Sequence, residues 1–183
     1  MSRISGTQIR VFLILMILSS ILWAQEDKKQ DIWEPFKFFL GQWEGKVEGK
    51  YGQAKIEQEF QFVLSGEFLR IENKSTFEPT EKEPKGEVHQ DLGFFSYDKN
   101  REKFVFRQFH VEGFVNQYVL ESISEDGKTL IFITESIENI PAGWRAKLTY
   151  KILDEDEFGQ IFELAPPDKD FEACAQGYLK RKR

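Results

Sequence analysis

Residues 41–51 read Gly41-Gln42-Trp43-Glu44-Gly45-Lys46-Val47-Glu48-Gly49-Lys50-Tyr51, and this stretch decides the fold. In an extended strand alternate side chains point to opposite faces. Here every second residue is small or apolar: Gly41, Trp43, Gly45, Val47, Gly49 and Tyr51. Small and large residues that alternate along one face suit the interior of a tapering barrel, and glycine lets another strand approach closely. We predict that this segment is the first strand of a β-barrel.

Alternation with period two continues to the end of the chain and is interrupted by turn sequences such as Glu125-Asp126-Gly127-Lys128. We predict ten strands, at 43–51, 54–64, 67–77, 88–97, 103–111, 114–123, 129–138, 144–153, 158–165 and 172–181. Short links of this kind join neighbouring strands, so the expected fold class is all-β, an antiparallel up-and-down barrel. Ile32 to Leu40 carries apolar residues at roughly helical spacing, which predicts a short N-terminal helix that caps one end of the barrel.

The Gly-x-Trp-x-Gly pattern at Gly41, Trp43 and Gly45, with a further glycine at Gly49, resembles the first strand of the nitrobindin-like and lipocalin-like β-barrels, a group similar to the fatty-acid-binding proteins. The resemblance implies a barrel that can enclose a ligand. Nitrobindin-like proteins bind ferric haem through a histidine near the final strands, whereas no histidine follows His110 here. The resemblance therefore implies the fold and disfavours haem as a cofactor, unless His110 supplies the iron ligand from an earlier strand.

Residues 1–24 have the pattern of a signal peptide, with Arg3 and Arg10 before an apolar run from Val11 to Leu22, and cleavage is expected after Ala24. An uncleaved membrane anchor is the alternative, but the apolar run is shorter than the roughly 20 residues that a spanning helix needs. The remaining expectations are a flexible leader at 25–31 and a barrel domain at 32–183. We therefore expect an exported protein, periplasmic or secreted, that has no stable membrane span after cleavage.

The composition narrows the range of partners. The chain of 183 residues carries a formal net charge of −6. An acidic surface repels phosphate backbones, so we expect no nucleic-acid partner. The one cysteine, Cys174, cannot form an internal disulfide.

Two neighbouring predicted strands combine aromatic and polar side chains on one face. The face of strand 103–111 carries Phe104, Phe106, Gln108 and His110, and the next strand carries Phe114, Asn116 and Tyr118. Such a mixture is typical of an apolar pocket with a few polar groups that orient a ligand. The candidate ligand-binding residues are Phe106, Gln108, His110, Asn116, Tyr118 and Trp144. For His110, the alternative to a ligand or base is a hydrogen bond to a buried neighbour such as Gln108 or Tyr118.

No catalytic motif is present in the sequence: it has no Gly-x-Ser-x-Gly elbow, no phosphate-binding glycine loop and no pair of histidines at zinc spacing. We therefore expect no catalysis, no metal site and no cofactor. The predicted function is an exported barrel that binds a small apolar or amphipathic molecule. Two alternatives remain at this point, a haem-binding barrel that uses His110 and a barrel without a ligand that has a structural or interaction role.

Overall fold

The computed structural model describes residues 31–50, 52–79 and 84–183. The chain divides into two compact units, residues 1–35 and 36–183. In the described end of the first unit, the Asp31 carboxylate accepts a hydrogen bond of 3.0 Å from the backbone N–H of Trp33. The predicted signal peptide, the leader up to residue 30 and Tyr51 lie outside the described residues. No helix in the described ranges is long and apolar enough to cross a membrane.

The described part of the chain contains ten strands and two short 3-10 helices. In chain order they are η1 (Glu34–Phe39), β1 (Gly41–Gly49), β2 (Gly52–Val63), η2 (Leu64–Gly66), β3 (Phe68–Phe77), β4 (Glu87–Asp98), β5 (Lys103–His110), β6 (Val115–Ile123), β7 (Thr129–Glu138), β8 (Arg145–Ile152), β9 (Glu157–Ala165) and β10 (Glu172–Arg181). Each strand begins and ends within two residues of its predicted bounds.

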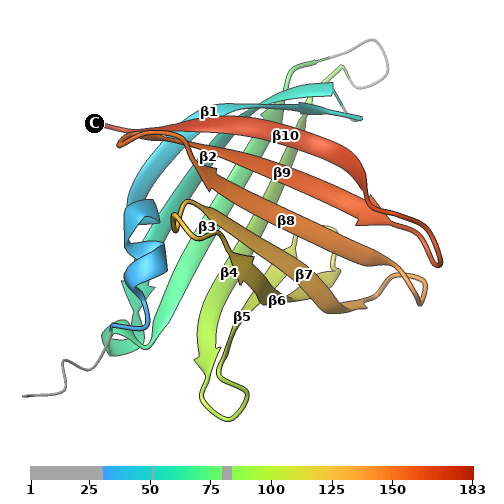
Figure 1. The fold of residues 1–183 in the computed structure, drawn as a ribbon. Coiled ribbons are helices and arrows are strands. Elements are labelled where there is room, and N and C mark those ends of the chain that lie inside the picture. Colours follow the sequence, from blue (N-terminus) through green and yellow to red (C-terminus); the bar gives the residue numbers. More distant parts are fainter. Residues whose placement is uncertain (1–30, 51, 80–83) are drawn as a thin grey trace, which may run out of the picture. The chain divides into compact units, whose positions relative to one another are not determined.

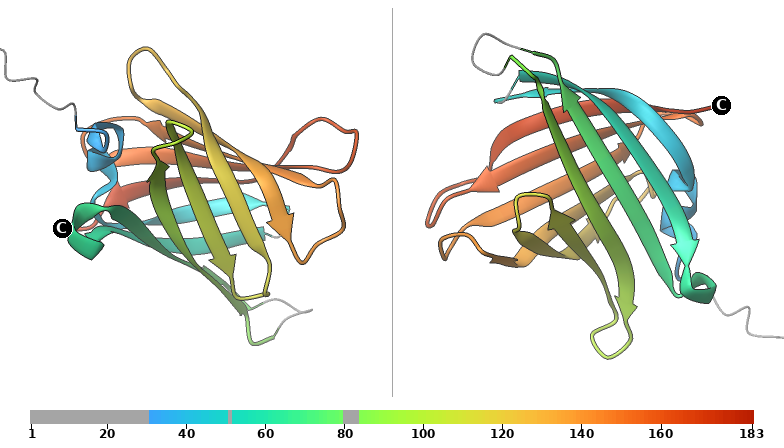
Figure 2. Two further views of the ribbon diagram at one scale, coloured as in Figure 1. Left: turned by 90° about the horizontal axis from the view of Figure 1, so that it is seen from below. Right: turned by 180° about the vertical axis from the view of Figure 1, so that it is seen from behind.

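Each strand pairs antiparallel with its neighbour in the sequence, and β1 pairs with β10 to close the barrel (Figure 1). The two views in Figure 2 show the long strands curving round one interior. The predicted ten-stranded up-and-down barrel is therefore confirmed. Closure leaves these ten strands without a free sheet edge, which removes the sites at which further strands could add.

The glycines of β1 allow its close approach to β10, as the sequence pattern predicted. A Cβ atom at Gly45 would lie 1.9 Å from the carbonyl oxygen of Tyr178, and one at Gly49 would lie 2.0 Å from that of Cys174. Distances below about 3 Å are not tolerated by real Cβ atoms. These two glycines therefore make the pairing that closes the barrel possible.

The predicted N-terminal helix is a 3-10 helix, and its aromatic residues plug one end of the barrel. Phe36 and Phe39 are each 2% exposed, and Trp43 donates a hydrogen bond of 2.6 Å from Nε1 to the carbonyl oxygen of Phe39. The Arg181 guanidinium donates to the carbonyl oxygens of Phe38 and Leu40 at 2.8 and 2.7 Å. A cation at these carbonyls satisfies acceptors that a helix end leaves unpaired.

The interior next to η1 is filled by packed aromatic rings. Phe36 lies 4.7 Å from Phe104 between ring centroids, and Phe39 lies 5.2 Å from Phe158. Other rings of this cluster are 3% exposed or less: Trp43, Phe60, Phe95, Phe106, Phe132 and Tyr150. Edge-to-face and stacked rings add to the stabilisation from burial, so this half of the interior is the hydrophobic core.

Candidate functional site

One row of inward-facing residues crosses five neighbouring strands. The strand register places Trp43 opposite Gln58, Gln58 opposite Asn73, Asn73 opposite Asp91 and Asp91 opposite His110. Paired residues of an antiparallel sheet lie on the same face, so these side chains are neighbours inside the barrel. The row runs from the aromatic core at Trp43 into a polar region that ends at His110.

Asp91 is the centre of this polar region. Its side chain is 1% exposed, and its two oxygens accept hydrogen bonds from Asn73 Nδ2 at 2.6 Å and Gln108 Nε2 at 2.7 Å. Gln58 Nε2 extends the network, because it donates to Asn73 Oδ1 at 3.2 Å and to Gln160 Oε1 at 2.8 Å. A buried carboxylate is costly unless it is hydrogen-bonded. Two amides, from β3 and β5, thus offset the burial of one acid on β4, and amides of β2 and β9 extend the network.

Two histidines and a second carboxylate lie beside Asp91. His89 Nε2 is 3.6 Å from Asp91 Oδ2, and His89 Nδ1 is 2.5 Å from Glu112 Oε1. Hydrogen bonding to Asp91, followed by Glu112, raises the pKa of His89 to about 9. Burial lowers the pKa of His110, whose Nδ1 lies 3.5 Å from His89 Nε2. At neutral pH His89 is therefore a cation held between two carboxylates, while His110 is neutral.

Asn116 and Tyr118 complete the network on β6. Asn116 Nδ2 lies 3.2 Å from His110 Nε2 and donates to the Tyr118 hydroxyl at 3.0 Å. Burial raises the pKa of Tyr118, so its phenol stays protonated. Two carbonyl oxygens in the described residues, Gln58 Oε1 and Asn116 Oδ1, are buried without a hydrogen-bond partner. Unpartnered buried acceptors are uncommon in native structures.

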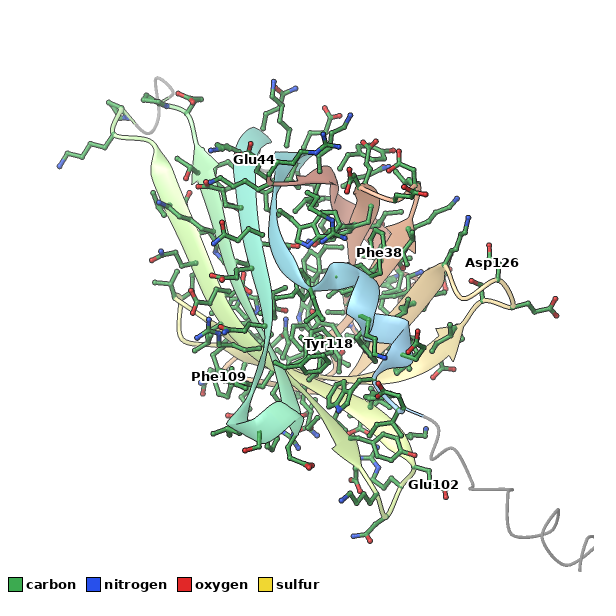
Figure 3. The ribbon with its side chains drawn as sticks, turned by 90° about the vertical axis from the view of Figure 1, so that its left-hand side faces the viewer. Phe38, Glu44, Glu102, Phe109, Tyr118 and Asp126 are labelled. Carbon is green, nitrogen blue, oxygen red and sulfur yellow. The ribbon has the colours of Figure 1, made fainter. Side chains whose placement is uncertain are left out.

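The structure brings four of the six predicted ligand-binding residues into one network: Gln108, His110, Asn116 and Tyr118. Tyr118 lies inside the barrel, whereas Phe109 lies at its periphery (Figure 3). Phe106 is also inside, but it is part of the aromatic core, where its ring stacks on Phe95 at 4.0 Å. Trp144 is half-buried, precedes β8 and takes no part in these hydrogen bonds.

Four members of the network, Gln58, Asn73, Asp91 and Gln160, were not predicted from the sequence, and neither were His89 and Glu112 beside it. His89 follows a charged, proline-containing stretch of the sequence, 78–87, which predicts a solvated rim position, whereas only 25% of its side chain is exposed. The parity of β4 places His89 and Asp91 on the same face, and β4 pairs with the strand that carries His110. Strand parity combined with hairpin pairing could therefore have found these two residues.

A groove of about 590 Å³ lies on the outside of the barrel wall. The groove is lined by two rows of outward-facing side chains on β1 to β5. The row from Trp43 to His110 runs between these two rows, and its backbone forms the floor of the groove. Its apolar members, Leu92, Phe109 and Val111, are 38%, 46% and 63% exposed. The sheet separates this groove from the polar network inside.

Comparison with known proteins identifies the fold. No protein-family model and no curated protein sequence matches the chain. Among solved structures, Rv2717c from M. tuberculosis has a TM-score of 0.64 at 19% identity, over 82% of this chain and 97% of that chain. A de novo designed fluorescence-activating β-barrel has a TM-score of 0.41 at 14% identity, over 79% of this chain and 94% of that chain. The redesigned barrel mFAP0, bound to DFHBI, has a TM-score of 0.42 at 9% identity, over 79% of this chain and 100% of that chain.

At 19% identity, the likeness to Rv2717c shows a shared barrel fold and nothing about function. The resemblance to nitrobindin-like and lipocalin-like proteins, beyond the barrel itself, stays a prediction.

Side chains that could ligate haem iron make other contacts in the described structure. Both ring nitrogens of His110 have neighbours, His89 on one side and Asn116 on the other, and its ring stacks on Phe114 at 4.0 Å. Iron binding at either nitrogen would displace one of these contacts. On the last strand, Tyr178 is 50% exposed, and the Cys174 thiol donates to a backbone carbonyl at 3.6 Å. Neither is placed as an iron ligand in the interior.

Proposed function

We propose that the protein is an exported, non-enzymatic barrel that binds a small amphipathic molecule at the polar end of its interior. The observation that carries the proposal is the convergence of hydrogen-bond acceptors on one interior region. The Asp91 carboxylate lies there, together with the unpartnered oxygens of Gln58 and Asn116. A ligand that donates hydrogen bonds would satisfy acceptors that the protein leaves open.

Solvent reaches this part of the interior. Inward-facing side chains near η1 are almost fully buried, whereas Asn73, Gln108 and His110 are half-buried. The side chain of the neighbouring His89 is 25% exposed, which supports an opening of the barrel here. A ligand can therefore enter without unfolding of the plug at η1.

Apolar side chains next to the network would hold the rest of the ligand. Phe114 stacks on His110, and the half-buried Phe162 lies two residues from Gln160 on the same face of β9. An alkyl chain that covers them gains about 25 cal/mol for each Å² of apolar surface removed from water. The expected ligand thus has an amine or hydroxyl head group and an apolar tail.

Calorimetric titration with three molecules that share one tail tests this proposal: 1-decylamine, 1-decanol and decanoate at pH 7. We expect one-to-one binding of the amine and the alcohol, and at least tenfold weaker binding of decanoate, because Asp91 repels a carboxylate. Asp91→Asn should reduce the preference for the amine. Glu121→Gln, at an exposed position on β6, is the matched control and should leave all three affinities unchanged.

The proposal is wrong if none of the three molecules binds, or if decanoate binds as tightly as the amine and Asp91→Asn changes nothing. Circular dichroism of each variant shows whether the barrel is intact. Native mass spectrometry of protein purified from its own host would then identify the natural ligand by mass.

A further inference from the structure

We propose that His89, His110 and Glu112 form a binding site for a divalent first-row transition metal ion, with Zn²⁺ as the ion that fits best. One ligand atom from each residue lies within 4.8 Å of the other two. Two imidazoles and one carboxylate make up a donor set that binds zinc with a coordination position left open. The site shares only His110 with the proposed ligand-binding network, and it requires no ligand there.

The strand register creates this cluster from residues that are far apart in the sequence. Asp91 pairs with His110, and the N–H of Val111 donates to the carbonyl oxygen of Gln90 at 3.0 Å, which continues the β4–β5 ladder. His89, two residues before Asp91, therefore lies across from Glu112, two residues after His110. The turn that follows β5 is tight, because Gly113 N–H donates to the carbonyl oxygen of His110 at 2.8 Å.

The distances between these side chains suit an ion after one small movement. Bonds of about 2.0–2.1 Å around a tetrahedral zinc ion place neighbouring ligand atoms roughly 3.3 Å apart. One candidate ligand atom of each residue lies within 4.8 Å of the other two, so these atoms must approach one another by at most about 1.5 Å. The contact of 2.5 Å between His89 Nδ1 and Glu112 Oε1 is a hydrogen bond. The Glu112 side chain is 42% exposed, so it can move by the ångström that an ion between the two groups requires.

Each imidazole also has a second polar partner that would hold it in place. His89 has Asp91 at 3.6 Å, and His110 has Asn116 at 3.2 Å. Metal-binding histidines generally donate their other ring N–H to a carboxylate or carbonyl oxygen. Rotation of the Asn116 amide would present its unpartnered Oδ1 to His110 Nε2. Both rings would then offer Nδ1 to the ion.

The charges of the cluster favour a divalent cation. Two carboxylates, Asp91 and Glu112, flank the two imidazoles, and the negative charge exceeds that of the one cationic ring. Replacing the extra proton of His89 with a divalent ion leaves two neutral imidazoles, two carboxylates and two positive charges. The ion therefore neutralises a region that is net negative without it.

Titration of tag-free protein with ZnCl₂ and CoCl₂ tests the site. The chain has only two histidines, so no other imidazole competes. We expect one Zn²⁺ per chain with a dissociation constant in the micromolar range or below, and visible Co²⁺ absorption bands of a four- or five-coordinate ion. His89→Gln and Glu112→Gln should each weaken binding at least tenfold. Glu121→Gln is the control for a lost carboxylate and should have no effect.

Absence of binding at 100 µM Zn²⁺, or binding that both substitutions leave unchanged, would overturn the proposal. Glu112→Gln lies at an exposed turn, so the variant is expected to fold, and circular dichroism checks this. The same variant should bind 1-decylamine like the original protein. Loss of metal binding with the amine affinity retained therefore separates this site from the proposed function, and failure of either leaves the other standing.

Discussion

Replacing Trp43 with alanine measures how much the aromatic plug contributes to the stability of the barrel. Trp43 is 1% exposed, and its ring lies 4.8 Å from that of Phe158 in an edge-to-face arrangement. Its Nε1 donates a hydrogen bond of 2.6 Å to the carbonyl oxygen of Phe39. The Arg181 guanidinium lies 4.1 Å from the ring centroid, which is a cation–π contact. The substitution removes all three interactions.

The expected loss in the free energy of unfolding is about 3–5 kcal/mol for truncation of a buried aromatic residue. Trp43→Phe keeps most of the ring but removes the donor, so we expect about 1–2 kcal/mol from the unpaired carbonyl oxygen. Phe109→Ala is the control, because Phe109 is 46% exposed on the outer wall and should cost less than about 1 kcal/mol.

Urea unfolding followed by circular dichroism gives these values without relying on the fluorescence of the residue that is replaced. A loss under about 1 kcal/mol for Trp43→Ala would show that this end of the barrel is not a packed core. An equal loss for Trp43→Phe and Trp43→Ala would show that the hydrogen bond, and not the packing, dominates.

Three further predictions concern the closure of the barrel and its histidines. Gly45→Ala should destabilise the protein by about 2 kcal/mol or more, because its Cβ would lie 1.9 Å from a β10 carbonyl oxygen; Gly159→Ala, whose nearest neighbour would be 3.6 Å away, should have a much smaller effect in the same urea assay. His89 has a pKa of about 9 in the folded protein and about 6.5 in an unfolded chain, so the stability it contributes is complete below about pH 6.5 and lost as the pH rises through 9. Urea midpoints across this range should fall by an amount equivalent to about 1–3 kcal/mol, and less in His89→Gln; a flat profile would contradict the assignment. Ferric haem should bind weakly or not at all, and a sharp one-to-one Soret band that His110→Ala abolishes would overturn this expectation.

The strands could be predicted from the sequence because their signal is local. Alternating side chains and turn residues define each strand within about ten residues, and the barrel follows from the short links between them. The same parity placed His110 and Asn116 inside. It could not show that His89 lies beside Glu112, because that contact depends on the register between two strands and on the turn after β5. Phe106 shows the same limit, since parity alone does not separate a pocket wall from packed core.

The two halves of the interior have opposite effects on stability. The rings around Trp43 and Phe39 remove a large apolar surface from water and favour folding. The polar half holds a buried carboxylate at Asp91 and two carbonyl oxygens without partners, each of which opposes folding unless it is compensated. Apolar side chains of similar volume would give a more stable barrel. The cost of this network is the physical ground for the proposed ligand site, and apolar burial at the plugged aromatic end offsets that cost.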